Sequence, residues 1–94
     1  MKIGDKVRSF DFAENFNGEI FGRDLEGKRA SYVEGKFVSI QVHPHAGYDC
    51  YEILVERDVF GGKESDRRVG SKVYPPVNGT PTMMGRVCDY VELV

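Results

Sequence analysis

Apolar and polar residues alternate most regularly at residues 38–42, whose sequence is Val-Ser-Ile-Gln-Val. A period of two predicts a β-strand with one buried face. Gly35 precedes this stretch, and a glycine within a strand pattern commonly marks a bulge or a sharp bend. The pattern therefore predicts one long, bent strand over residues 32–42, around which the rest of the chain is organised.

Shorter segments supply the other expected strands. Residues 51–56 alternate apolar with polar positions, and residues 3–12, 69–74 and 85–94 contain shorter extended patterns. No window of ten or more residues places apolar side chains at helical spacing between a cap and a stop. The patterns predict an all-β domain of about five strands, in which Ile40→Ala is expected to cost about 2–5 kcal/mol as a core truncation. The expected core consists of Val7, Phe10, Val38, Ile40, Val42, Ile53, Val55, Val73, Val91 and Leu93.

The least regular part of the chain follows the first expected strand. Residues 14–31 contain three turn signals, each with a glycine. The chain has 94 residues, which suffices for one domain with a modest core and leaves no room for a second. We therefore expect a single domain over residues 1–94 with one long irregular loop.

The charge balance and the lack of long apolar runs bound the cellular environment. The chain has 13 basic and 15 acidic side chains, and its net charge is −2. Its longest aliphatic run, residues 53–55, is far shorter than the roughly 20 residues of a membrane-spanning helix. Residues 1–6 lack the apolar stretch of a secretory signal. These features favour a cytoplasmic protein that makes no membrane contact.

Three segments carry a resemblance to SH3-like barrels. Residues 89–94, Asp-Tyr-Val-Glu-Leu-Val, resemble the ending of SH3 domains. Residues 3–7 and 35–40 resemble the glycine-led strands of SH3-like barrels such as Tudor and KOW modules. The resemblance implies a small SH3-like barrel and implies no particular activity.

A second resemblance concerns two other segments. Residues 57–64 and 73–80 are similar to segments of small uncharacterised proteins encoded by bacterial viruses. This resemblance implies no biochemical role.

The chain departs from the SH3 domains that bind proline-rich peptides. Those domains line their groove with tyrosines and a tryptophan, whereas this chain has no tryptophan. The resemblance carries over only Tyr90 as a groove tyrosine. An aromatic cage of the Tudor kind would draw on Tyr48, Tyr51 and Tyr74, but half-buried barrel positions explain the same three residues.

The expected binding surface is built around residues 74–77, Tyr-Pro-Pro-Val. The run is apolar and stiff, so its presentation costs little conformational entropy. Because prolines cannot donate ladder hydrogen bonds, we expect the run to leave the barrel and lie on its surface; the alternative is that it only closes one end of the barrel. The leading interpretation is a non-catalytic module that binds a protein partner or a second copy of itself. Its expected contact residues are Tyr48, Tyr74, Pro75, Pro76, Val77 and Tyr90.

The alternative function is nucleic-acid binding of the KOW type. Basic side chains gather in one polar stretch, where they alternate with Glu64 and Asp66. Nucleic-acid binders usually show a more concentrated positive patch. The candidate phosphate contacts are Lys63, Arg67, Arg68 and Lys72.

Two further groups of residues have the composition of chemical sites. His43, His45, Asp49 and Cys50 are ligand types that suit zinc, but a proline-centred turn explains them without a metal. We expect no metal, no cofactor and no catalytic residue, since sequence proximity alone shows neither a base beside a nucleophile nor an oxyanion site. Cys50 and Cys88 are expected to remain thiols, because disulfides are rare inside cells.

Overall fold

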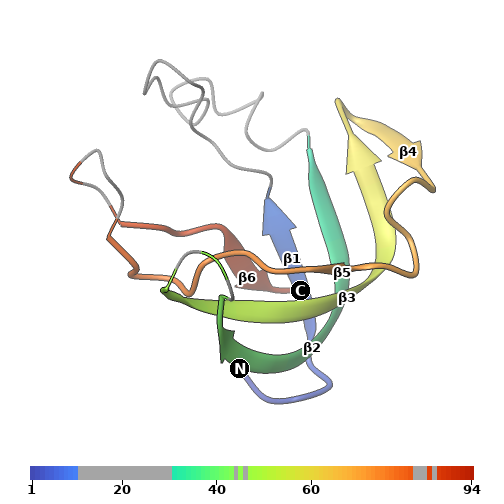
Figure 1. Ribbon diagram of the computed structural model, residues 1–94. Helices are drawn as coiled ribbons and strands as arrows, with labels where there is room; N and C mark the ends of the chain where they lie inside the picture. The colour runs from blue at the N-terminus through green and yellow to red at the C-terminus, as the bar shows by residue number, and fades with distance from the viewer. Residues whose placement is uncertain (11–30, 44, 46, 82–84, 86) are drawn as a thin grey trace.

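The computed structural model describes residues 1–10, 31–43, 45, 47–81, 85 and 87–94 (Figure 1). This part of the chain contains no helix, and therefore no helix that is long and apolar enough to cross a membrane. The all-β class and the strand number of about five are confirmed. The predicted loop at residues 14–31 lies outside the described residues, apart from Ser31. The strands are β1 (Lys6–Phe10), β2 (Tyr32–Val42), β3 (Asp49–Phe60), β4 (Lys63–Ser65), β5 (Lys72–Val73) and β6 (Val91–Leu93).

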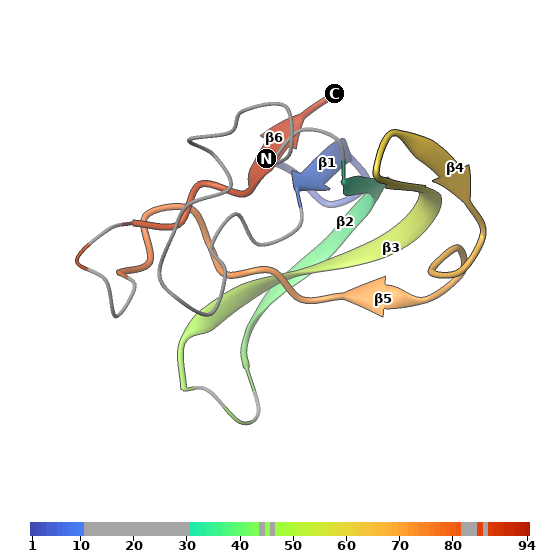
Figure 2. The same cartoon turned by 90° about the horizontal axis from the view of Figure 1, so that it is seen from above.

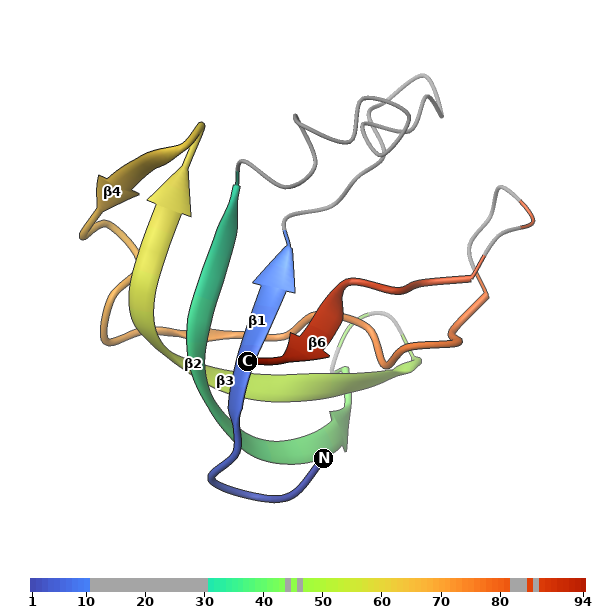
Figure 3. The ribbon, with the colours of Figure 1, turned by 180° about the vertical axis from the view of Figure 1, so that it is seen from behind.

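The six strands form one antiparallel sheet. Their order is β4-β3-β2-β1-β6, and β5 pairs with the first half of β3. Figures 1 and 3 show that the two long strands, β2 and β3, bend together. One end of this hairpin therefore runs beside β4 and β1, while the other end extends beyond them. The resemblance to SH3-like barrels stays a prediction.

Gly35 lies at the bend of β2, as the sequence predicts. The register between β2 and β3 shifts between Glu34 and Gly35, which is the signature of a β-bulge. A Cβ atom at Gly35 would overlap the carbonyl oxygen of Leu54 and lie 2.7 Å from its carbonyl carbon. Only glycine lets the two backbones approach so closely.

The core is packed against the first half of β3. Its central cluster is made of Val7, Phe37, Tyr51, Ile53, Cys88, Tyr90 and Val91. Five of the expected core residues are buried, namely Val7, Phe10, Ile53, Val55 and Val91. Val38 and Val73 are partly buried.

The core prediction is wrong for three residues. Ile40 is 55% exposed, Val42 is 62% exposed and Leu93 is 60% exposed. A second register shift between Phe37 and Ser39 gives Phe37 the core position, and the strand then continues past the residues that β1 covers. The alternation at 38–42 thus marks a strand but not a buried face.

A row of alternating charges crosses the other half of the sheet. Buried Glu34 pairs with Arg8 and with Arg57, whose Nη1 lies 3.3 Å from Glu34 Oε1. The row continues outward from Arg8 to Glu92 at 3.8 Å and from Arg57 to Glu64 at 2.5 Å. Burial raises the pKa of Glu34, but the hydrogen bonds from the two arginines outweigh it, so the pKa is lowered overall.

Candidate protein-binding site

Residues 74–77 run along the free edge of β3 instead of leaving the sheet. The Tyr51 amide donates a hydrogen bond to the Pro75 carbonyl at 2.8 Å, and the Val77 amide donates to the Asp49 carbonyl at 3.1 Å. Pro76 forms a β-bridge with Cys50 between these two bonds. The prediction that the prolines lie away from the sheet is therefore wrong. Proline lacks a donor, but its carbonyl still accepts.

This pairing makes the end of the β2–β3 hairpin three segments wide. A hollow with a volume of ≈ 360 Å³ lies at this end and is lined by Gln41, His43, His45 and Tyr74. We name it the aromatic hollow. The Tyr74 side chain is 40% exposed. The hollow offers ring faces and a carboxamide on a backbone that is hydrogen-bonded across all three segments.

The turn between β2 and β3 positions the two histidines. The His43 amide donates to the Tyr48 carbonyl at 2.8 Å, and the ring centroids of these residues lie 5.5 Å apart. The His45 amide donates to Nδ1 of His43 at 3.2 Å, which orients the His43 ring. His43 and His45 have ring centroids 6.1 Å apart in an edge arrangement.

The structure separates the predicted contact residues into two groups. Tyr74 lines the hollow, and the ring of Tyr48 lies beside that of His43, which also lines it. Pro75 and Pro76 are buried and Val77 packs partly against the core. Tyr90 is 6% exposed and belongs to the core cluster, so it presents no groove surface.

Sequence reasoning missed that Ile40 and Val42 are exposed at this end of the hairpin. Both flank Gln41 on β2 and are more than half exposed. Their alternation with polar residues is the same as that of a buried strand face, and it carries no sign of where the neighbouring strand ends. The sequence predicts an extended segment over residues 3–12, whereas β1 has only five residues against eleven in β2, so the end of β2 has no neighbour in β1.

The zinc ligand types do not converge. Among the residues that the structure describes, no group of three or more His, Cys, Asp or Glu side chains is placed to hold a metal. Cys50 is fully buried, and its Sγ donates to the Gln41 carbonyl at 3.3 Å. Burial, with the nearby charges of Asp49 and Glu52, raises the pKa of the Cys50 thiol. Cys88 is also buried.

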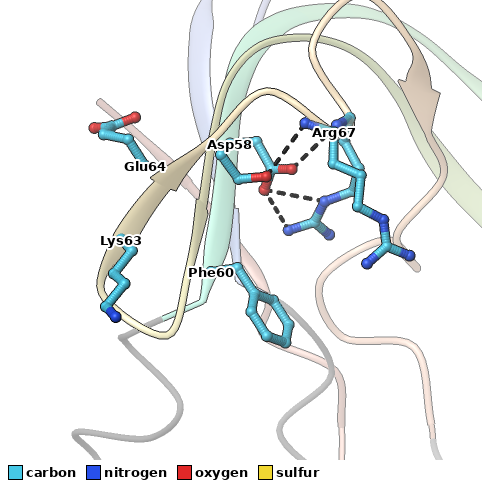
Figure 4. A pocket seen from close by; sticks show the side chains of 7 residues that line it. Asp58, Phe60, Lys63, Glu64 and Arg67 are labelled. Atoms are coloured by element: carbon cyan, nitrogen blue, oxygen red, sulfur yellow. Dashed lines mark hydrogen bonds and ion pairs between the residues drawn. The ribbon is translucent and has the colours of Figure 1, made fainter.

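The basic residues lie at the opposite end of β3. A second hollow, of ≈ 320 Å³, is lined by Asp58, Phe60, Lys63, Glu64, Ser65, Arg67 and Arg68 (Figure 4). We name it the charged hollow. Arg68 donates to buried Asp58 through Nη2 at 2.7 Å, Nε at 3.1 Å and its amide at 3.1 Å. These bonds hold the pKa of Asp58 below its usual range.

Only part of the predicted basic set stays available for phosphate. Arg68 is bound to Asp58, and Lys72 Nζ lies 2.9 Å from Glu52. Lys63 and Arg67 are exposed at the rim, beside Phe60, which is 65% exposed. Figure 4 shows the side chains of Lys63 and Arg67 on either side of Phe60.

Comparison with known proteins adds no relative. No family model matches the chain, and neither the curated proteins nor the solved structures contain a significant match. The geometry of the two hollows is therefore the basis for assigning a function.

Proposed function

We propose that the chain is a non-catalytic protein-interaction module whose binding surface is the end of the β2–β3 hairpin. One observation supports this most directly: aromatic and aliphatic side chains gather there in exposed positions. Tyr74 and the two histidines line the aromatic hollow, and Ile40 and Val42 are more than half exposed at the same end of the hairpin.

Two physical arguments favour a protein partner. Aromatic side chains are enriched where protein surfaces meet, and they form the anchors of interfaces. The hairpin end is also rigid, because hydrogen bonds link β2 to β3 and β3 to the Tyr74–Val77 run. Little ordering entropy is then lost on binding.

The test is affinity capture with matched variants. Wild-type protein, Tyr74→Ala and Phe60→Ala serve as baits in extract of the cells that make the protein. Tyr74 and Phe60 are both exposed aromatics, so the variants differ mainly in which hollow loses its ring. A protein retained by wild type and Phe60→Ala but lost from Tyr74→Ala supports the proposal. Equal retention by all three baits, or retention of no protein, refutes this surface.

Nucleic-acid binding at the charged hollow is the second candidate. The observation in its favour is the exposed Phe60 ring between Lys63 and Arg67, since bases stack on aromatics while basic groups contact phosphate. The net charge of −2 and the pairing of Arg68 and Lys72 with carboxylates weigh against it.

Fluorescence anisotropy with a single-stranded oligonucleotide distinguishes this candidate. Binding should fall by a factor of about ten or more between about 50 and 200 mM salt if several phosphates are contacted. Phe60→Ala should weaken it and Tyr74→Ala should not. Absence of binding at low salt removes the candidate.

A further inference from the structure

We propose that the protein associates with a second copy of itself through the free edge of β2, by antiparallel pairing about a two-fold axis at Ile40. The inference rests on the proposed function, because it takes a second copy as the protein partner. It adds the identity of that partner, the register and the contact residues.

Among the described residues, no strand pairs with the edge of β2 at the end of the hairpin. β1 pairs with β2 only from Tyr32 to Lys36. The N-terminal turn then covers Phe37, whose carbonyl accepts from the Gly4 amide at 2.8 Å. Beyond this point, the described part of the chain places β3 on one side of β2 and no strand on the other. Figure 2 shows the hairpin end projecting away from β1, β6 and the N-terminus.

The backbone groups of Ile40 and Val42 point toward this open edge. The hydrogen bond from the His43 amide to the Tyr48 carbonyl marks a bonded pair between the two strands, and bonded pairs alternate with non-bonded pairs in an antiparallel ladder. Ile40 and Val42 therefore fall in non-bonded pairs. The hydrogen bonds of β3 support this assignment. Tyr51 lies opposite Ile40, and its amide donates to the Pro75 carbonyl on the side of β3 that faces away from β2.

The other edges of the sheet are short or partly occupied. The side-chain amide of Asn78 donates to the Val91 carbonyl at 2.8 Å and its oxygen accepts from the Val91 amide at 3.3 Å, which occupies the start of β6. β3 is covered by β4, β5 and the Tyr74–Val77 run. The β4 edge is three residues long and carries Lys63 and Glu64. Short length and charge are usual means of preventing edge pairing.

The β2 edge carries none of these devices over residues 39–42. It has no proline and no charged residue, and Ile40 and Val42 are 55% and 62% exposed. An exposed apolar strand edge is a template for another strand. The bulge before Ser39 limits the pairing to a few residues.

A second copy fits this edge better than an unrelated strand. Residues 38–42 are Val-Ser-Ile-Gln-Val. Their order of apolar and polar residues is the same in both directions. An antiparallel two-fold axis places Ile40 opposite Ile40 of the second copy and Ser39 opposite Gln41, while Val42 approaches the bulge at Val38. Aliphatic side chains then meet on one face and hydrogen-bonding side chains on the other, without opposed like charges. In such an isologous contact both copies use the same residues, so the assembly is complete as a dimer.

The test exploits the two-fold axis and uses sedimentation equilibrium of the purified protein. Wild type should show a weak, concentration-dependent dimer, because so short a pairing buries less than a standard interface of roughly 1,200 Å². Ile40→Lys and Ile40→Glu should each weaken association at least about tenfold, since each opposes like charges at the axis. An equimolar mixture of the two should recover dimer, because lysine then faces glutamate.

Leu93→Lys is the matched control. It also replaces an exposed aliphatic residue at a sheet edge, 60% exposed, and should leave dimerisation unchanged. Val42→Lys gives a second perturbation of the same edge and should weaken association even if an Ile40 variant folds poorly; circular dichroism checks folding.

Three results would overturn the inference. The wild-type protein could be a monomer at every concentration up to about 1 mM, or the Ile40 and Val42 variants could dimerise as strongly as wild type. The third result is a mixture of Ile40→Lys and Ile40→Glu that dimerises no more strongly than either variant alone. None of these results affects the capture experiment, so loss of a protein from Tyr74→Ala would leave the proposed function standing.

Discussion

Gly35→Ala should destabilise the protein more than any other glycine-to-alanine change at a described position. The added Cβ would overlap the carbonyl oxygen of Leu54 and lie 3.0 Å from the Cα atom of Val55. Both neighbours are backbone atoms in the centre of the sheet, so no side-chain rotation relieves the contact. β2 and β3 would have to move apart at the bulge.

The expected loss of stability is about 2–4 kcal/mol. Inserting a methyl group into a close-packed site costs about 1–3 kcal/mol. Separation of the strands weakens about two ladder hydrogen bonds, each worth about 1 kcal/mol. Alanine also restricts the unfolded chain, which offsets about 0.4–1 kcal/mol.

Urea unfolding at constant pH measures this change, with Gly47→Ala as the control. Gly47 has φ of 72° and open space around its Cβ position, so alanine there meets only the cost of left-handed backbone, about 1–2 kcal/mol, less the same unfolded-state offset. Gly35→Ala should therefore lower the urea midpoint more than Gly47→Ala does. A Gly35→Ala protein as stable as wild type, or more stable than Gly47→Ala, would refute the close-approach argument.

Three other predictions concern stability. Ile40→Ala should lower the free energy of unfolding by less than about 1 kcal/mol, because Ile40 is more than half exposed. Ile53 is fully buried, so Ile53→Ala should lower it by about 2–5 kcal/mol. Chemical denaturation of the two variants measures both values. The Arg68 hydrogen bonds lower the pKa of Asp58 in the folded state, so the pair stabilises the fold above the unfolded pKa of about 3.9 and this contribution is lost as the pH falls through the lower folded value. Asp58→Asn should remove that part of the acid sensitivity, and a pH series of melting temperatures that is identical to wild type would contradict it. Asn78→Ala should cost about 1–3 kcal/mol, because an amide and a carbonyl of β6 lose their partner, and faster hydrogen exchange confined to β6 would locate the effect.

Local sequence rules predicted the central strand and its bend. The period-two pattern and Gly35 placed a long strand at residues 32–42, the same bounds as β2. They succeeded because strand geometry imposes its period on any half-buried segment and because close backbone approach requires glycine. Burial of Val7, Ile53 and Val91 follows from the same periodicity.

Pairing between distant segments could not be predicted in the same way. Asp58 and Arg68 are ten residues apart and meet only because β4 turns the chain back, so the basic stretch gave no sign that one of its arginines was already bound. The Tyr74–Val77 run was misplaced for a related reason. The rule about proline concerns the missing donor, and the structure uses the carbonyl.

Ile40 and Val42 carry the most information about function, because here the sequence pattern and the burial disagree. A strand that only supported the core would gain nothing from aliphatic side chains in water, and exposed apolar groups on an open edge invite unwanted pairing. The chain shields its β6 edge with Asn78 and leaves this one apolar. Local rules that fail at a few positions commonly mark functional sites. The aromatic hollow, which Gln41 of the same strand lines, lies at the same end of the hairpin, so a partner that pairs with β2 would also lie close to Gln41. Variants of Tyr74 therefore test the proposed binding surface, and variants of Ile40 test the pairing of two copies, which only the combined Ile40→Lys and Ile40→Glu variants can restore by charge exchange.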